Sequence, residues 1–143
     1  MSYEEYIKIL EVLKTKNDIE AKDKLMNSMI NPSLIPMLEP KIILLIKEKF
    51  QIIINKMISN LETMFMNNYE LDQYIFNFKK EVKFIYSLTN LKEITNEKRI
   101  ETQTMLKDET NKVYEILINK ANQIDLTGVL SMTIKNNEIK WGE

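Results

Sequence analysis

Acidic side chains at helical spacing are the first residues in this sequence that could carry chemistry. Glu97 and Glu101 are four positions apart, so they share one face of a helix. Asp108 and Glu109 follow about two turns further along. Carboxylates grouped in this way can bind Mg²⁺ or Ca²⁺, but nothing here resembles a calcium-binding loop with its glycine hinge. We therefore interpret these acids as a solvated helix face, and we predict no metal or other cofactor.

A small basic cluster is the second candidate. Lys79, Lys80 and Lys83 lie close together, with aromatic residues beside them in the sequence. Lysines interleaved with aromatic rings can contact phosphates and unpaired bases. With Arg99, the sole arginine, they form a candidate nucleic-acid-binding site. The net charge of −1 and the absence of a longer basic stripe in the sequence make nucleic acid the alternative partner. The other interpretation is that these lysines are the solvent side of an amphipathic helix.

The residue types that are missing exclude several kinds of enzyme. Histidine and cysteine are absent, which removes the commonest general base and the ordinary zinc ligands. Glycine occurs only at positions 128 and 142, so there is no glycine-rich loop for a nucleotide phosphate. We predict that the protein is not an enzyme.

Length and composition indicate one folded domain. The 143 residues, 44% hydrophobic and 29% charged, are typical of a globular protein. The first residues lack the basic region of a secretion signal. The central apolar run, residues 42–46, is far shorter than the roughly 20 residues of a membrane span. Together with the lack of cysteine, these features predict a cytoplasmic protein that does not enter a membrane.

Glycine and proline punctuate the chain in a way that predicts long helices. Proline occurs only at positions 32, 36 and 40, and the stretch 41–127 contains neither residue. Ser2 with Glu5, and Thr95 or Asn96 later on, are typical helix starts. The predicted helices begin at Ser2, at Asn17, at Pro40 (running to about 67), at about Glu70 (running into the high eighties) and at 95–96 (running to about 122).

The helix predicted from residue 40 to 67 has the widest apolar face. A face this broad is typical of a central bundle helix or of one that meets a partner. Its apolar stripe comprises Ile46, Phe50, Ile53, Met57, Leu61 and Met64.

The chain after Gly128 has a different pattern. Met132 and Ile134, and then Ile139 and Trp141, alternate with polar residues, which is typical of strands. An Asn-Asn pair lies between the two halves and favours a type I′ turn. We therefore predict a short C-terminal β-hairpin. A lone hairpin is marginal in water, so it must pack on the helices, pair with another chain or fray.

Together these patterns predict an all-α fold. Residues 1–127 would form an antiparallel bundle of four to five helices, and residues 128–143 a β-hairpin appendage of the same domain. The predicted function is a non-enzymatic protein-binding module of the immunity, antitoxin, phage inhibitor or adaptor type, which occludes or bridges a partner protein. A homo-oligomer is a sub-case. The predicted contact surface is the broad helix face or the tail, whose residues are Met132, Ile134, Ile139 and Trp141. Alternatively, Trp141 folds back and covers one end of the bundle.

Overall fold

The computed structural model of the chain describes residues 1–65 and 68–141, and over these residues the fold is all-α. It has seven α-helices and one short 3₁₀ helix in this part of the chain, and no strand. The elements are α1 (Tyr3–Thr15), α2 (Ile19–Asn27), η1 (Pro32–Leu34), α3 (Ile35–Ser59), α4 (Leu61–Met64), α5 (Asn68–Leu88), α6 (Asn96–Ile124) and α7 (Val129–Asn136). The prediction of an all-α fold is confirmed.

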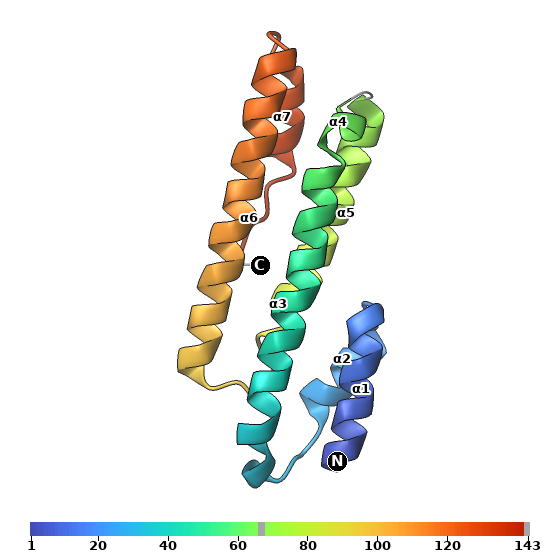
Figure 1. The fold of residues 1–143 in the computed structure, drawn as a ribbon, viewed down its shortest axis with the longest axis vertical. Coiled ribbons are helices and arrows are strands. Elements are labelled where there is room, and N and C mark those ends of the chain that lie inside the picture. The colour runs from blue at the N-terminus through green and yellow to red at the C-terminus, as the bar shows by residue number, and fades with distance from the viewer. Residues whose placement is uncertain (66–67, 142–143) are drawn as a thin grey trace.

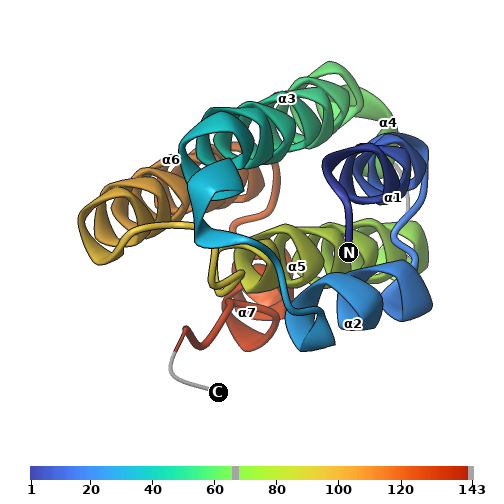
Figure 2. The ribbon, with the colours of Figure 1, turned by 90° about the horizontal axis from the view of Figure 1, so that it is seen from below.

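Three long helices set the long axis of the molecule. Helices α3 and α6 run in the same direction, and α5 runs against both (Figure 1). The short helices α1 and α2 lie against one half of this framework, whereas α7 turns back along the other half of α6 (Figure 1). Figure 2 shows α5 between other helices, with α3 on one side of it and α2 and α7 on the other. Helices α3 and α5 therefore pack both against the N-terminal helices and against the C-terminal helices.

The hydrophobic core has two clusters, one in each half. The first joins α1 and α2 to the start of α3 and the end of α5, through residues such as Tyr6, Leu25, Ile42, Ile46 and Ile85. The second joins α4 and the ends of α3 and α6 to α5 and α7, through residues such as Met64, Ile75, Phe78, Leu117 and Ile134. Ile53 and Ile54 pack against both clusters. Helices α3 and α5 thus contribute residues to both core clusters.

Local caps account for several helix starts. The Ser2 hydroxyl accepts a hydrogen bond from the Glu5 amide at 3.2 Å, and the Thr95 hydroxyl accepts one from the Lys98 amide at 3.4 Å. Both predicted starts are confirmed. The second helix begins slightly later than predicted, because Asp18 is its cap and accepts from the Ala21 amide at 3.1 Å.

The long third helix differs from its prediction at both ends. It begins at Ile35, because η1 leads into it and Pro36 occupies its first turn, where a missing N–H costs little. Pro40, the predicted start, lies inside it. The helix stops at Ser59, and the short α4 follows. The last part of the predicted range, residues 66–67, lies outside the described residues.

The predicted C-terminal β-hairpin is wrong, because residues 129–136 form the helix α7. A type I′ turn needs positive φ at both central residues, and no described non-glycine residue has one. Instead the helix ends at Asn136, and the Asn137 side chain donates to the Thr133 carbonyl at 2.8 Å and to Asp72 at 3.0 Å. The Asn-Asn pair therefore ends a helix rather than reversing a strand.

The turn before α7 explains why a helix begins there. Gly128 has φ 80°, a left-handed conformation that glycine adopts without strain. The Asp125 carboxylate accepts hydrogen bonds from the Thr127 amide and hydroxyl and from the Leu130 amide, so it caps the new helix. These bonds, chiefly that from the Thr127 hydroxyl, lower the pKa of Asp125. Residues 125–128 thus join α6 to α7 in a tight helical hairpin.

Two buried tyrosines make the fold sensitive to alkali. Burial, reinforced by the neighbouring carboxylate of Glu93, raises the pKa of Tyr6 above its ordinary value of 10.0. Burial and Glu138 likewise raise the pKa of Tyr114, whose hydroxyl donates to the Asn137 carbonyl at 2.9 Å. Above pH 10 the unfolded chain can ionise both phenols, whereas the folded chain resists it. The stability that these groups contribute is therefore present below pH 10 and is lost as the pH rises further.

Between about pH 9.5 and 11.5, we expect the free energy of unfolding to decrease less steeply in Tyr6→Phe and in Tyr114→Phe than in the original chain. Urea unfolding at several pH values measures this slope for the original chain and each variant. Burial lowers the pKa of Lys49, so this group contributes in the opposite sense. It is common to all three chains, and the comparison of their slopes removes it. An unchanged slope in both variants would contradict the prediction.

Candidate functional site: a basic groove between α3 and α5

An open groove of about 840 Å³ lies between α3 and α5 and extends to the start of α2. Its size falls in the range of about 300–1,000 Å³ that is usual for ligand sites. Because α3 and α5 are antiparallel neighbours, residues far apart in the sequence line its two walls (Figure 1). This groove is the candidate functional site.

The floor of the groove is mostly apolar. Met57 and Phe78 are buried parts of the second core cluster, and Ile53 packs against both clusters. Ile19, at the start of α2, is 63% exposed and lies at the edge. Met57 and Phe78 are only 5% and 3% exposed, so a bound group would remove apolar surface from water chiefly at Ile19 and the half-buried Ile53.

Four lysines surround this floor. Lys22 comes from α2, Lys56 from α3, and Lys80 and Lys83 from α5. Within the described residues, none of the four has a carboxylate oxygen within 4.0 Å of its ammonium group. Glu81 is the one acidic residue among those described in the lining. The groove is therefore positively charged although the whole chain has a net charge of −1.

Two of these lysines are held by neighbouring side chains. Lys22 donates to the Ser87 hydroxyl at 3.2 Å, and its ammonium group lies 5.2 Å from the centre of the Phe84 ring. The ammonium group of Lys80 lies 5.5 Å from the ring centre of Phe76. Such contacts restrain a lysine while leaving its other N–H groups available.

A smaller cavity of about 230 Å³ adjoins the groove, with Ile53, Lys56 and Glu81 in both linings. Lys49 lines it too and donates to the Leu13 carbonyl at 2.6 Å, near the end of α1. Burial lowers the pKa of Lys49, and the nearby Glu81 opposes that shift. Lys49 thus holds α1 against α3, because a cation near a helix C-terminus is favourable.

The predicted basic cluster is only partly brought together. Lys80 and Lys83 line the groove, whereas Lys79 is not among its lining residues. Lys22 and Lys56 complete the basic rim, and sequence reasoning missed both of them. They come from other helices, so no spacing along the chain marks them as neighbours of Lys80.

Arg99 lies elsewhere and holds the connection between α5 and α6. Its guanidinium donates to the Thr89 carbonyl at 2.7 Å, to Leu91 at 3.1 Å and to Ile94 at 2.8 Å. A fourth bond, of 2.6 Å, goes to the Asn96 side chain. Four of its five N–H groups are therefore engaged within the protein.

The residues predicted to bind a partner through the tail are separated by the helix α7. Ile134 is fully buried and Ile139 is 9% exposed, so both belong to the second core cluster. Trp141 is partly buried, and its ring centre lies 5.0 Å from that of Tyr86. Met132 is 63% exposed. The structure places one of these four residues, Met132, largely in solvent.

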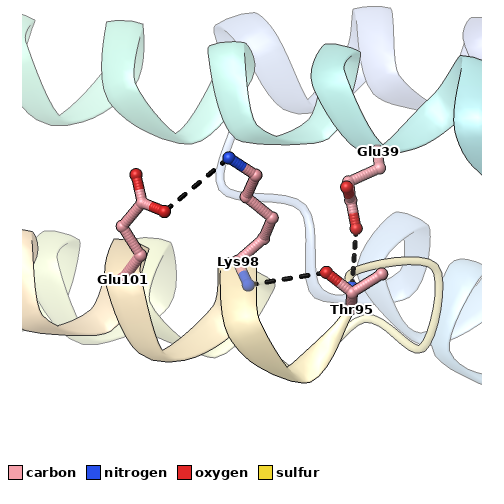
Figure 3. A network of polar contacts seen from close by, with 4 residues as sticks. All are labelled: Glu39, Thr95, Lys98 and Glu101. Carbon is pink, nitrogen blue, oxygen red and sulfur yellow. Dashed lines mark hydrogen bonds and ion pairs between the residues drawn. The ribbon is translucent and has the colours of Figure 1, made fainter.

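The acidic residues of α6 are also separated. Glu101 pairs with Lys98 at 3.7 Å, and Glu109 pairs with Lys112 at 3.1 Å. Figure 3 shows the first pair at the start of α6, where the Glu39 carboxylate of α3 also accepts from the Thr95 amide at 2.7 Å. No group of three or more acidic side chains suited to a metal ion occurs among residues 1–65 and 68–141. Glu101 and Glu109 thus pair with lysines of their own helix, and Glu39 joins α3 to the residue before α6.

Comparison with protein-family models, with curated proteins and with solved structures gives no match to this chain. In the part of the chain that the structure describes, no helix combines the length and apolar character needed to cross a membrane.

Proposed function

We propose that the protein is a non-enzymatic binding module that takes up a segment of a partner protein in the basic groove, and so occludes or bridges that partner. One observation carries the proposal: the groove combines an apolar floor with four lysines that have no carboxylate partner within 4.0 Å among the described residues. Exposed apolar surface rimmed by polar groups is typical of a protein-interaction site.

The groove replaces the tail as the proposed contact surface. Ile134 and Ile139 stabilise the core, so they are not accessible to a partner unless α7 detaches. The groove, in contrast, is accessible without any change in the fold. The absence of cysteine fits a reducing compartment, and the proposal places the protein in the cytoplasm.

Binding of single-stranded nucleic acid is the second candidate. Lys22 and Lys56 extend the cluster of Lys80 and Lys83 across the groove, which gives a larger basic surface than the sequence alone indicates. Such a surface attracts phosphates, and its affinity for them falls as salt increases.

Site-specific cross-linking distinguishes these candidates. Because the chain has no cysteine, Asn77→Cys provides one attachment point inside the groove for a photoactivated cross-linker. Asn111→Cys, exposed on α6 and outside the groove, is the matched control. In an extract of cells that naturally make the protein, we expect a discrete protein adduct from position 77 and none from position 111. The adduct should survive nuclease treatment.

Equal adducts from both positions, or none from position 77, would contradict the proposed function. An adduct that nuclease removes would identify nucleic acid as the partner. Adding Lys80→Glu and Lys83→Glu to the Asn77→Cys chain should abolish the specific adduct, because this double change reverses the charge of one wall.

A further inference from the structure

We propose that the occupant of the groove is an acidic amphipathic helix of the partner protein. This inference rests on the proposed function and specifies the chemistry of the bound segment. Four features of the groove favour this occupant: its length, the composition of its floor, the charge of its rim and the state of its aromatic rings.

The length of the groove suits a short helix. Tyr74 and Ser87 both line it and lie thirteen positions apart on α5. At about 1.5 Å per residue, that stretch of helix is about 20 Å long. A helix of roughly 13 residues lying alongside α5 would have the same length.

The walls of the groove are helices, which decides the mode of recognition. A peptide that binds by adding a strand needs a sheet edge, and the described residues contain no strand to receive it. A groove between helices instead takes an amphipathic helix, whose apolar residues at i, i+4 and i+7 reach the floor. Ile53 and Met57, themselves four positions apart on α3, present such a surface.

The four lysines of the rim favour acidic residues on both flanks of the bound helix. Lys22 and Lys83 come from different helices, and Lys56 comes from a third. Glutamates on both sides of the apolar stripe of a bound helix could approach these ammonium groups while the stripe contacts the floor. A basic or neutral helix would leave the lysines without partners, and their partial desolvation would then oppose binding.

The aromatic rings favour a peptide over single-stranded nucleic acid. A base stacks on a ring only where the flat face is open. Phe78 is 3% exposed. The ring centre of Phe84 already has the ammonium groups of Lys22 at 5.2 Å and Lys49 at 5.9 Å. Phe78 and Phe84 thus give no open face to a base, which leaves the half-buried Tyr74 as the one other ring in the described lining.

Fluorescence anisotropy with synthetic probes tests the inference on the full chain. The main probe is a labelled 18-residue peptide of leucine and glutamate, with leucine at i, i+4, i+7 and i+11. The comparison probes are a peptide of identical composition in scrambled order, a leucine–lysine peptide with the original pattern, and a labelled 20-nucleotide poly-dT strand. We expect the leucine–glutamate peptide to bind about tenfold or more tightly than each of the others.

The double variant Lys80→Glu, Lys83→Glu should weaken binding of this peptide about tenfold or more. The matched control is Lys41→Glu, Lys47→Glu, which makes the same change of charge at two exposed positions of α3 outside the groove. It should leave the affinity within about twofold, because the mobile salt screens distant charges. Circular dichroism of both variants checks that the fold is retained.

Other results would overturn the inference in distinct ways. Equal binding of the scrambled peptide would exclude recognition of an amphipathic helix, and tighter binding of poly-dT would make nucleic acid the occupant. Equal loss of affinity in both double variants would exclude the groove as the site. If no probe binds but the nuclease-resistant adduct at position 77 forms, this inference fails while the proposed function stands. If neither occurs, both fail.

Discussion

Replacing Arg99 by alanine should lower the free energy of unfolding by about 2–4 kcal/mol. The substitution removes four hydrogen bonds that the guanidinium donates, three of them to carbonyls of the α5–α6 connection. A hydrogen bond from a charged group contributes about 1.5–3 kcal/mol, less where it is partly exposed, as here. The carbonyls of Thr89 and Leu91, both fully buried residues, would lose partners that water cannot easily replace. Urea unfolding followed by circular dichroism measures the effect.

Two controls separate the geometry of Arg99 from its charge. Arg99→Lys keeps the charge but cannot reach several carbonyls at once, so it should recover only a small part of the loss. Lys98→Ala removes the neighbouring exposed cation and its 3.7 Å pair with Glu101, and should cost about 0.5 kcal/mol or less. If Arg99→Ala is as stable as Lys98→Ala, then Arg99 does not hold this connection, and its role as a nucleic-acid contact would need to be considered again.

Replacing Ile134 by alanine should cost about 2–4 kcal/mol, whereas Met132→Ala should cost about 0.5 kcal/mol or less. Ile134 is fully buried against α5 and α6, and Met132 is 63% exposed. The two changes remove similar amounts of side chain two positions apart, so each is the control for the other. The same urea unfolding experiment compares them.

This pair of substitutions also tests the structure of the tail. Residues two apart in a helix are separated by about 200° and point to different sides, whereas in a strand they share a face. In the β-hairpin indicated by the sequence, Met132 and Ile134 would share one face, and alanine would cost about the same at both. A large difference confirms α7, and equal losses would contradict it.

Features fixed by neighbouring residues were predictable from the sequence. The caps at Ser2 and Thr95 depend on a hydroxyl and an amide three positions later, so the local sequence determines them. The all-α class followed from the absence of glycine and proline over residues 41–127. Neither inference requires knowledge of how the helices pack.

The tail was mispredicted because two short patterns competed. The alternation of Met132 and Ile134 is typical of a strand, but Leu130 and Ile134 are also four positions apart, as one face of a helix requires. Over so few residues periodicity cannot distinguish the two, and the capping bonds of Asp125 favour the helix. Asp125 followed by Gly128 was the local signal that could have indicated it.

The sequence indicated only part of the candidate site, and the reason differs from that for the tail. Lys80 and Lys83 are close in the sequence, whereas Lys22 and Lys56 reach the groove only because α2 and α3 pack beside α5. Arg99 looked like a member of the cluster, yet its bonds go to the connection that precedes α6. Proximity in the sequence does not reveal which partner a long side chain finds, so the rim of the groove is a property of the tertiary structure.

The position of Ile53 and Ile54 has a consequence for how the protein would report binding. These residues pack against both core clusters, and Ile53 also lines the groove. A segment seated there would stabilise the native state, and every opening reaction that disrupts α3 would become less frequent. In amide hydrogen exchange, protection would therefore increase in the α1–α2 hairpin, whose helix α2 lines one edge of the groove, and also in the α6–α7 hairpin, which contributes no residue to the described lining. Binding at the middle of α3 would therefore stabilise both halves of the molecule against opening.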